Sequence, residues 1–284
     1  MHPRPTNRII VAQYSPPEGL SLVAAAELLG EGRRAVAAQI VDLAVRKVVT
    51  ISRDAGKRKR SGFTLTYTGA EPGGEDERAI LVTLFSNALT AGETLRLDPG
   101  RNRVLGERLK GPHRWITARL IDRGLAREMP FWLKILSPRG KHPVVPTEAA
   151  QPLIDHLWGL HDYIRLAEKD RLAYLQSPDG ALRRSAVNDL EVLVLNERLL
   201  PYAVLFGLEK QWMKELDVQY RALPPELLDS VGDVLLATEV IVNGVSLIAD
   251  LATLVDAADA FEGLGAVFGG IGDFLGGLDF PDFG

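Results

Sequence analysis

Along the first 70 positions, the spacing of hydrophobic and polar residues alternates between the pattern of a strand and the pattern of a helix. Ser21 is suited to cap a helix that Gly30 ends. Apolar residues at helical spacing follow, and then Phe63, Leu65 and Tyr67 alternate with threonines. The pattern predicts a strand over 8–14, helices over 22–29 and 33–47, and strands over 48–51 and 63–67. Helix, helix, strand, charged turn and strand is the order of a winged helix.

A similar order recurs further along the chain. After a linker over 69–77, the pattern predicts a helix over 78–89, a strand over 93–97 and one or two helices over 101–122. Aligning 43–49 with 120–126 brings Leu43 onto Leu120, Arg46 onto Arg123 and Val48 onto Leu125. We therefore expect an α+β protein with tandem winged-helix-like modules at 8–69 and 75–136.

The second half of the sequence has the pattern of an α-helical domain, expected over 147–221. A Pro-rich joint precedes it, and apolar residues then lie on one face of a long helix over 153–175. A second helical hairpin is expected over 189–220, with Pro201 at a boundary or kink. We expect the remaining residues, 222–284, to form a flexible tail that is acidic, apolar and finally Gly-rich.

Charge divides the chain into two unlike halves. Residues 1–141 contain 24 Lys and Arg against 14 Asp and Glu, whereas 142–284 contain 9 against 23. The tail carries eleven carboxylates and no Lys or Arg. This asymmetry predicts a basic part that meets an anion or docks on an acidic part. Two solvated surfaces of different charge are the alternative.

Two further features limit the classes of protein. There is no cysteine, which excludes disulfides and thiolate metal sites. Residues 234–255 are long enough to span a bilayer. Glu239, Asn243 and Asp250 within that stretch argue against a span, because buried carboxylates are costly in lipid. We expect that helix to pack in protein or to lie on a surface.

The sharpest chemical feature is a basic turn between the two strands of the first module. On a wing it would form a compact cationic group able to neutralise phosphates or anionic lipid. The candidate anion or nucleic-acid contacts are Arg33, Arg34, Arg53, Lys57, Arg58, Lys59 and Arg60. Base-reading residues are scarce on the preceding helix, which disfavours sequence-specific recognition. An ordinary solvated turn is the third interpretation.

Candidate catalytic residues are few. His156 and His161 share a helix with Asp155 and Asp162, but the two histidines are five residues apart, whereas ligands on one helix face are three or four apart. A hydrolytic or metal enzyme using them is the weakest hypothesis. No cofactor and no catalytic residue is expected. The four tryptophans, Trp115, Trp132, Trp158 and Trp212, are expected to be core or interface anchors.

Four strings of the sequence resemble a known family. They are QYSPPEGLS at 13–21, VDLAVR at 41–46, AEKDRLAYLQSPDGA at 167–181 and LLPYAVLFGLEKQW at 199–212. They are similar to the domain of unknown function 2207, the YciQ-like predicted bacterial membrane proteins, over about residues 8–215. Members typically have a secreted β-domain, a membrane helix and a cytoplasmic region like this chain. The resemblance implies no established activity, cofactor or catalytic residue.

The chain departs from that family pattern. The secreted domain, the first membrane helix and the later membrane hairpin are missing, so we expect a soluble member or a fragment of a longer membrane protein. The expected function is a non-enzymatic cytoplasmic interaction or scaffold module of a membrane-associated family. It would bind a protein partner at the inner face of the cell membrane. The alternative is nucleic-acid binding through the basic wing Arg53–Arg60; the oligomeric state is open.

Overall fold

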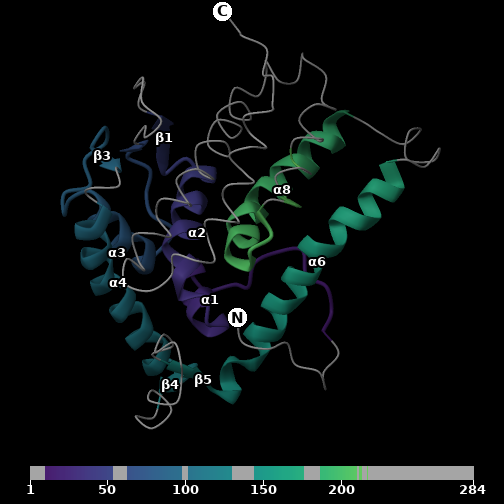
Figure 1. Cartoon of the computed structure of the whole chain (residues 1–284), viewed down its shortest axis with the longest axis horizontal. Helices are drawn as coiled ribbons and strands as arrows, with labels where there is room; N and C mark the ends of the chain where they lie inside the picture. The colour runs from purple at the N-terminus through teal and green to yellow at the C-terminus, as the bar shows by residue number, and fades with distance from the viewer. Residues whose placement is uncertain are drawn as a thin grey trace, which may run out of the picture.

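The computed structural model describes residues 10–53, 63–97, 102–129, 144–175, 186–209, 211–212 and 216. It is a mixed helical and β structure, which confirms the α+β class (Figure 1). The first part contains α1 (Leu22–Leu29), α2 (Gly32–Val45), β1 (Val49–Arg53), β2 (Phe63–Tyr67), α3 (Glu75–Leu84), β3 (Thr94–Leu97), α4 (Asn102–Asp122) and β4 (Ala126–Glu128). It is followed by β5 (Val144–Pro146), a 3-10 turn η1 (Glu148–Ala150), α6 (Gln151–Leu175) and α8 (Ala186–Phe206).

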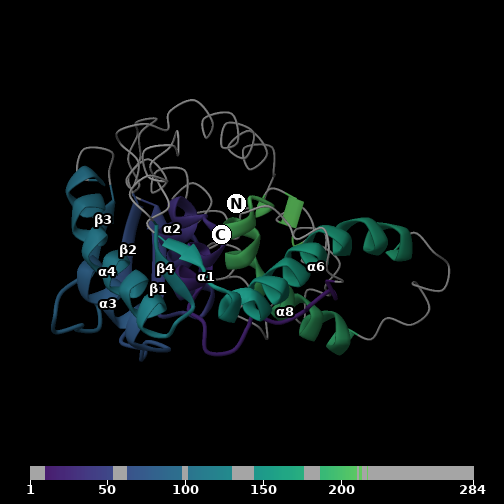
Figure 2. The same cartoon turned by 90° about the horizontal axis from the view of Figure 1, so that it is seen from below.

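Helices α1 and α2 lie in the middle of the molecule. The α3–α4 pair lies on one side of them and α6 with α8 on the other, as Figures 1 and 2 both show. One hydrophobic core runs through all of these layers, from Leu28 and Leu43 through Leu65 and Ile116 to Leu157. The core therefore crosses both of the boundaries predicted from the sequence, near 69–75 and near 136–147.

The caps predicted for α1 are confirmed. The backbone N–H of Ala24 donates to the hydroxyl oxygen of Ser21 at 3.2 Å. Gly30 ends the helix in the left-handed region at φ 73°, where its N–H bonds the carbonyl of Glu27. Because every residue of α1 is buried, its small and aliphatic side chains serve packing on all sides.

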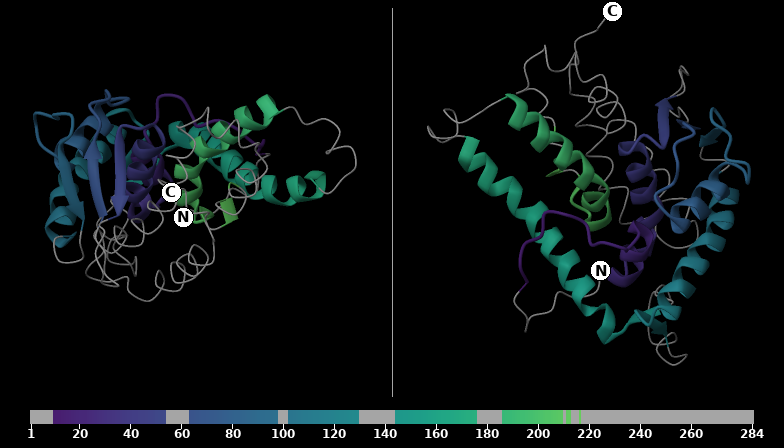
Figure 3. Two further views of the ribbon diagram at one scale, coloured as in Figure 1. Left: turned by 90° about the horizontal axis from the view of Figure 1, so that it is seen from above. Right: turned by 180° about the vertical axis from the view of Figure 1, so that it is seen from behind.

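The strand predicted over 8–14 is wrong for residues 10–14, which form no strand in the described part of the chain. They cross α6 instead, and Figure 3 shows this segment passing over that helix. A Cβ atom at Gly159 would lie 2.2 Å from the main-chain oxygen of Val11. One turn earlier, the His156 ring contacts the carbonyl of Ser15 at 2.8 Å. The missing side chain at Gly159 thus allows the close crossing.

The main sheet is antiparallel with the order β1-β2-β3. Ile51 pairs with Leu65, and Leu65 pairs in turn with Leu95. β3 was expected in the second module, yet it completes the sheet of the first. Strand position alone does not reveal its partner, because pairing is decided by which apolar faces meet in the core.

The two segments of the short sequence repeat, 43–49 and 120–126, end their helices, α2 and α4, in the same way. At the end of α2, Lys47 has φ 60° and the N–H of Val48 bonds the carbonyl of Leu43 at 2.8 Å. At the end of α4, Gly124 has φ 70° and the N–H of Leu125 bonds the carbonyl of Leu120 at 2.9 Å. β1 and β4 then begin at equivalent positions, 49 and 126, the same 77 residues apart as the helix ends.

The return strands of the two hairpins also end alike. Thr68 follows β2 and its hydroxyl donates to the carbonyl of Lys47 at 2.7 Å. Thr147 follows β5 and its hydroxyl donates to the carbonyl of Gly124 at 2.5 Å. The chain therefore contains two helix–strand–strand units, and the second is completed by β5, which lies beyond the boundary expected at 136.

Several predicted helix boundaries differ from the structure; for example, α3 was predicted to run to 89 and ends at Leu84. α3 begins at Glu75, three residues before the expected start, because Glu75, Asp76 and Glu77 supply negative charge to its first turn. The sequence predicts a boundary or a kink at Pro201, but α8 continues through this residue to Phe206. The expected helical hairpin over 189–220 falls within the described residues only as far as α8 and a few positions after it.

Candidate functional site

The basic hairpin predicted from the sequence has the expected strand pairing. The last residue of β1, Arg53, pairs with the first residue of β2, Phe63, so residues 54–62 join two neighbouring antiparallel strands. Lys57, Arg58, Lys59 and Arg60 fall in this connection and lie outside the described residues. The side chains of Arg33 and Arg53 also lie outside them. These six positions stay predictions.

Arg34 is the predicted contact whose side chain the structure describes. Its guanidinium group donates to the main-chain oxygen of Val204 at 3.0 Å and forms an ion pair with Glu209 at 3.2 Å. Gly207, in the left-handed region at φ 75°, packs against the same guanidinium group. Arg34 therefore joins the start of α2 to the end of α8, and its charge is used within the protein.

The contact between α2 and α8 is an antiparallel helix pair. Arg34 near the start of α2 meets the end of α8, whereas the charge of Lys47, just past α2, acts on Glu197 further back along α8. Residues 35–41, 43 and 44 are buried, so this stretch of α2 has almost no exposed face. Burial, with the charge of Asp42 adding to it, raises the pKa of Tyr202 on α8.

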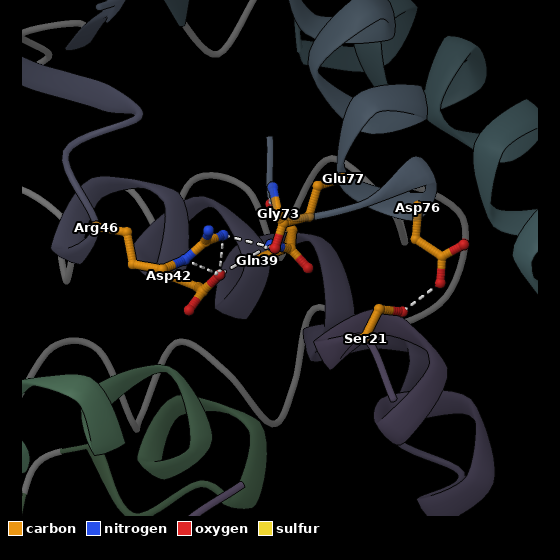
Figure 4. Close-up of polar contacts among 7 residues, drawn as sticks. All are labelled: Ser21, Gln39, Asp42, Arg46, Gly73, Asp76 and Glu77. Atoms are coloured by element: carbon orange, nitrogen blue, oxygen red, sulfur yellow. Dashed lines mark hydrogen bonds and ion pairs between the residues drawn. The ribbon is translucent and has the colours of Figure 1, made fainter. Parts of the chain in front are cut away.

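Arg46 lies at the end of α2 and connects it to α3 (Figure 4). Its guanidinium group is 2.6 Å from the carboxylate of Asp42 and 2.6 Å from that of Glu77. Burial raises the pKa of Asp42, although the hydrogen bond and charge of Arg46 act in the opposite direction. Gln39 donates to Asp42 at 3.1 Å, and Gly73 N–H donates to Glu77 at 2.6 Å. The cluster serves to hold α2 and α3 together.

A second set of polar contacts connects α1, α3 and α4. Asp76 accepts from the hydroxyl of Ser21, as Figure 4 shows, and from Arg119 on α4 at 2.8 Å. On the same helices, Glu27 is almost fully buried and lies 3.0 Å from His113. Burial by itself lowers the pKa of His113, but the hydrogen bond and charge of Glu27 outweigh it and the pKa is raised.

The two histidines of the metal hypothesis have separate surroundings. His156 contacts the carbonyl of Ser15, and the ring of His161 packs edge-on against Trp158 and Phe206, with centroid distances of 5.0 and 5.4 Å. Across the described part of the chain, no three His, Asp or Glu side chains are grouped in a way that could hold a metal ion.

Glu197 is a buried carboxyl group that sequence reasoning missed. It is 7% exposed on α8, and within the described part of the chain its Oε1 has no hydrogen-bond partner. Burial raises its pKa to about 8, although the charge of Lys47 acts in the opposite direction. The available signal was helical spacing, because Leu200 and Val204, three and seven residues after Glu197 on α8, are both in the core.

The tryptophans divide into two kinds. Trp158 and Trp212 are buried, as expected for core anchors, and the indole N–H of Trp212 donates to the carbonyl of Asn196 at 2.9 Å. Trp115 is 41% exposed on the outer face of α4, with the guanidinium group of Arg119 at 4.7 Å from its ring. Trp132 lies outside the described residues. Trp115 is therefore a surface aromatic residue on a basic helix.

Comparison with protein-family models, with curated proteins and with solved structures finds no match to this chain. Within the ranges that the structure describes, no helix combines the length and hydropathy needed to cross a bilayer. The apolar stretch over 234–255 lies outside those ranges.

Proposed function

We propose that this protein is a non-enzymatic interaction module, built from two winged-helix-like units and a pair of long helices. It acts in the cytoplasm as a peripheral component of a membrane-associated system, in keeping with its resemblance to the cytoplasmic region of the domain of unknown function 2207. Its partner is a protein at the inner face of the cell membrane, and the basic N-terminal half favours anionic surroundings.

The burial of α2 is the observation that carries this proposal. α2 precedes the hairpin of the first unit, which is where a winged-helix protein that reads nucleic acid has its recognition helix. Such a helix must leave one face open to enter the major groove. Here α8 covers α2, and Arg34 of α2 forms an ion pair with Glu209, just after the end of α8. This use of the winged-helix unit as a packing surface favours a protein-interaction role.

The polar residues of the described part also favour an interaction role. Arg46, Arg119 and His113 each bind carboxylates from another element, and His156 binds the N-terminal segment. These groups hold helices in fixed relative positions. A rigid set of helices with fixed outer faces is what a scaffold requires.

Cell fractionation of the native protein tests the proposal. We expect the protein to sediment with membranes, to be released by high salt, and to co-purify with a partner. The variant with Lys57, Arg58, Lys59 and Arg60 changed to alanine should be released at lower salt. Protein that stays in the supernatant and co-purifies with nothing would refute the proposal. Resistance to a carbonate wash would also refute it, because the chain would then be inserted rather than peripheral.

Nucleic-acid binding through the basic wing is the second candidate, favoured by the pairing of Arg53 with Phe63, which puts the basic connection at the end of a hairpin. It predicts an affinity for duplex DNA that falls steeply with salt, because binding releases counterions. The four-alanine variant should bind more weakly. Salt-independent binding, or none, would exclude this candidate.

A further inference from the structure

The duplicated units of this chain differ in what covers them. Positions 77 residues apart are equivalent, since the ends of α2 and α4 have the same hydrogen bonds and both lead into a strand. Arg34, Ala38 and Val41 lie at i, i+4 and i+7 on the face of α2 that meets α8. Ala38 and Val41 are buried there, at 0% and 2% exposure.

The equivalent face of α4 is open. Gly111, Trp115 and Ala118 take the places of Arg34, Ala38 and Val41, and all three are exposed. α4 packs on α3 and α1 through its other side, with Leu109, Ile116 and Leu120 in the core. In Figure 3 α4 lies at the opposite edge of the molecule from α6 and α8. The second unit thus lacks, among the described elements, a helix in the position that α8 takes on the first.

The residues of this open face determine what fits it. Trp115 is 41% exposed and lies between two small residues, Gly111 and Ala118, each about one turn away, while the guanidinium group of Arg119 lies 4.7 Å from its ring. Tryptophan and arginine are the residues that most often dominate binding energy at protein interfaces. A single nucleic-acid strand binds best in a groove where several aromatic rings stack on its bases. The surface of α4 is convex and has one exposed aromatic residue among its described side chains, so it suits another helix better.

Among its described side chains, this face carries more positive than negative charge. Arg108 and Arg114 are exposed on either side of Trp115, and neither has an ion-pair partner among the described residues. Arg119 is neutralised by Glu75 and Asp76 of α3. Of the described side chains of α4 on this face, Asp122 is the one that is negatively charged. A partner must therefore bring carboxylates to meet Arg108 and Arg114.

We infer that the outer face of α4, around Trp115, Arg108 and Arg114, is a docking site for an acidic amphipathic helix of a partner protein. That helix lies on α4 as α8 lies on α2, with apolar residues against Trp115 and carboxylates toward the two arginines. The inference rests on the proposed function, because it names the surface and the partner chemistry of that interaction module.

Binding of a labelled peptide to the full chain tests this docking site. The probe is a 21-residue helix with leucine and alanine on one face and glutamate on the other, and its twin has lysine in place of glutamate. We expect the acidic peptide to bind and the basic twin not to bind. Trp115→Ala should weaken binding at least tenfold, as for an interface hot spot. Arg108→Gln/Arg114→Gln should weaken it by a similar factor.

Arg165→Gln/Arg198→Gln is the matched control, because it removes two exposed positive charges from α6 and α8. Its affinity should stay within twofold of the wild type. Equal binding of both peptides, no binding, or wild-type affinity in the α4 variants would overturn the inference. Circular dichroism of each variant separates lost binding from lost folding.

A second copy of the chain or a lipid surface could bind this face of α4 instead, and each would give a distinct experimental result. Sedimentation velocity showing a dimer that Trp115→Ala abolishes would assign the face to a second copy, whose tail carries eleven carboxylates, and would overturn the inference. Binding to phosphatidylglycerol vesicles that Trp115→Ala abolishes would assign it to lipid, with the same consequence. If fractionation finds neither membrane nor partner while the acidic peptide binds α4, the proposed function fails and the docking site stands.

Discussion

The guanidinium group of Arg34 lies 3.2 Å from the carboxylate of Glu209, and the Glu209 side chain has no exposed surface. In the sequence Arg34 stands beside Arg33 at the start of a helix, the place where contacts to an external anion are expected. The structure gives its charge an internal partner 175 residues away. This ion pair fixes α8 on α2 and leads to the first prediction.

Arg34→Met should lower the free energy of unfolding by roughly 3–5 kcal/mol, because it leaves a buried carboxylate without its counter-charge. Denaturation by urea measures this. Arg165→Met is the control, since Arg165 is exposed and lies 3.9 Å from Asp162, and its effect should be within about 0.5 kcal/mol. Removing both charges in Arg34→Met/Glu209→Met should restore part of the loss. Equal stability of the two single variants would contradict this role for Arg34.

The Glu27–His113 pair predicts a pH-dependent contribution to stability. Because the folded protein raises the pKa of His113, the stabilisation is complete below the unfolded value of about 6.5 and is lost as pH rises through the folded pKa. The difference in unfolding free energy between the wild type and His113→Gln should therefore be larger at pH 6 than at pH 9.

NMR titration of His113 provides a second measurement of the same pair. In Glu27→Gln the pKa of His113 should fall, because burial alone lowers it. A His113 pKa that does not change in this variant, together with an unfolding difference that is constant from pH 6 to 9, would show that the pair has no such effect.

Glu197 predicts a second loss of stability with rising pH, this time from a carboxyl group that is neutral when protonated. Its pKa of about 8 in the folded protein, against 4.5 ordinarily, means that the folded state retains a proton that the unfolded state releases. Wild-type stability should fall between these two values by up to about 1.4 kcal/mol per pH unit. Glu197→Gln lacks this loss, so it should be more stable than the wild type at pH 8 and similar to it at pH 4.5.

Thermal unfolding of Glu197→Gln at both pH values checks this expectation. Glu128→Gln, which removes an exposed carboxyl group from β4, controls for the change in net charge. If Glu197→Gln is no more stable than the wild type at pH 8, the buried carboxyl group is not held in its neutral form.

Gly159 predicts a steric effect on the N-terminal segment. The methyl group of Gly159→Ala would meet the oxygen of Val11 at 2.2 Å, so the crossing over α6 must open. We expect a loss of roughly 1–3 kcal/mol, as for other overpacked sites, and faster proteolysis within residues 10–17. Gly111→Ala on α4 is the control, because no atom lies within 4 Å of its Cβ position. It should leave stability unchanged or raise it by up to about 1 kcal/mol.

The local elements were largely predictable from the sequence. Ser21 and Gly30 set the ends of α1, alternation identified β2, and helical periodicity identified α6. The likeness of 43–49 to 120–126 is matched by equal helix ends. These signals act over a few residues, through capping hydrogen bonds, positive φ angles and the side-chain periods of helix and strand. A local pattern is therefore enough to read them.

The tertiary structure alone decided which of these elements meet. It placed β3 beside β2, set residues 10–15 against Gly159, and covered α2 with α8 while leaving the equivalent face of α4 open. It also gave Arg34 and Glu27 their partners. Such contacts join residues tens to hundreds of positions apart, and they are chosen by which apolar surfaces and opposite charges can be buried together. No local pattern in the sequence carries that information.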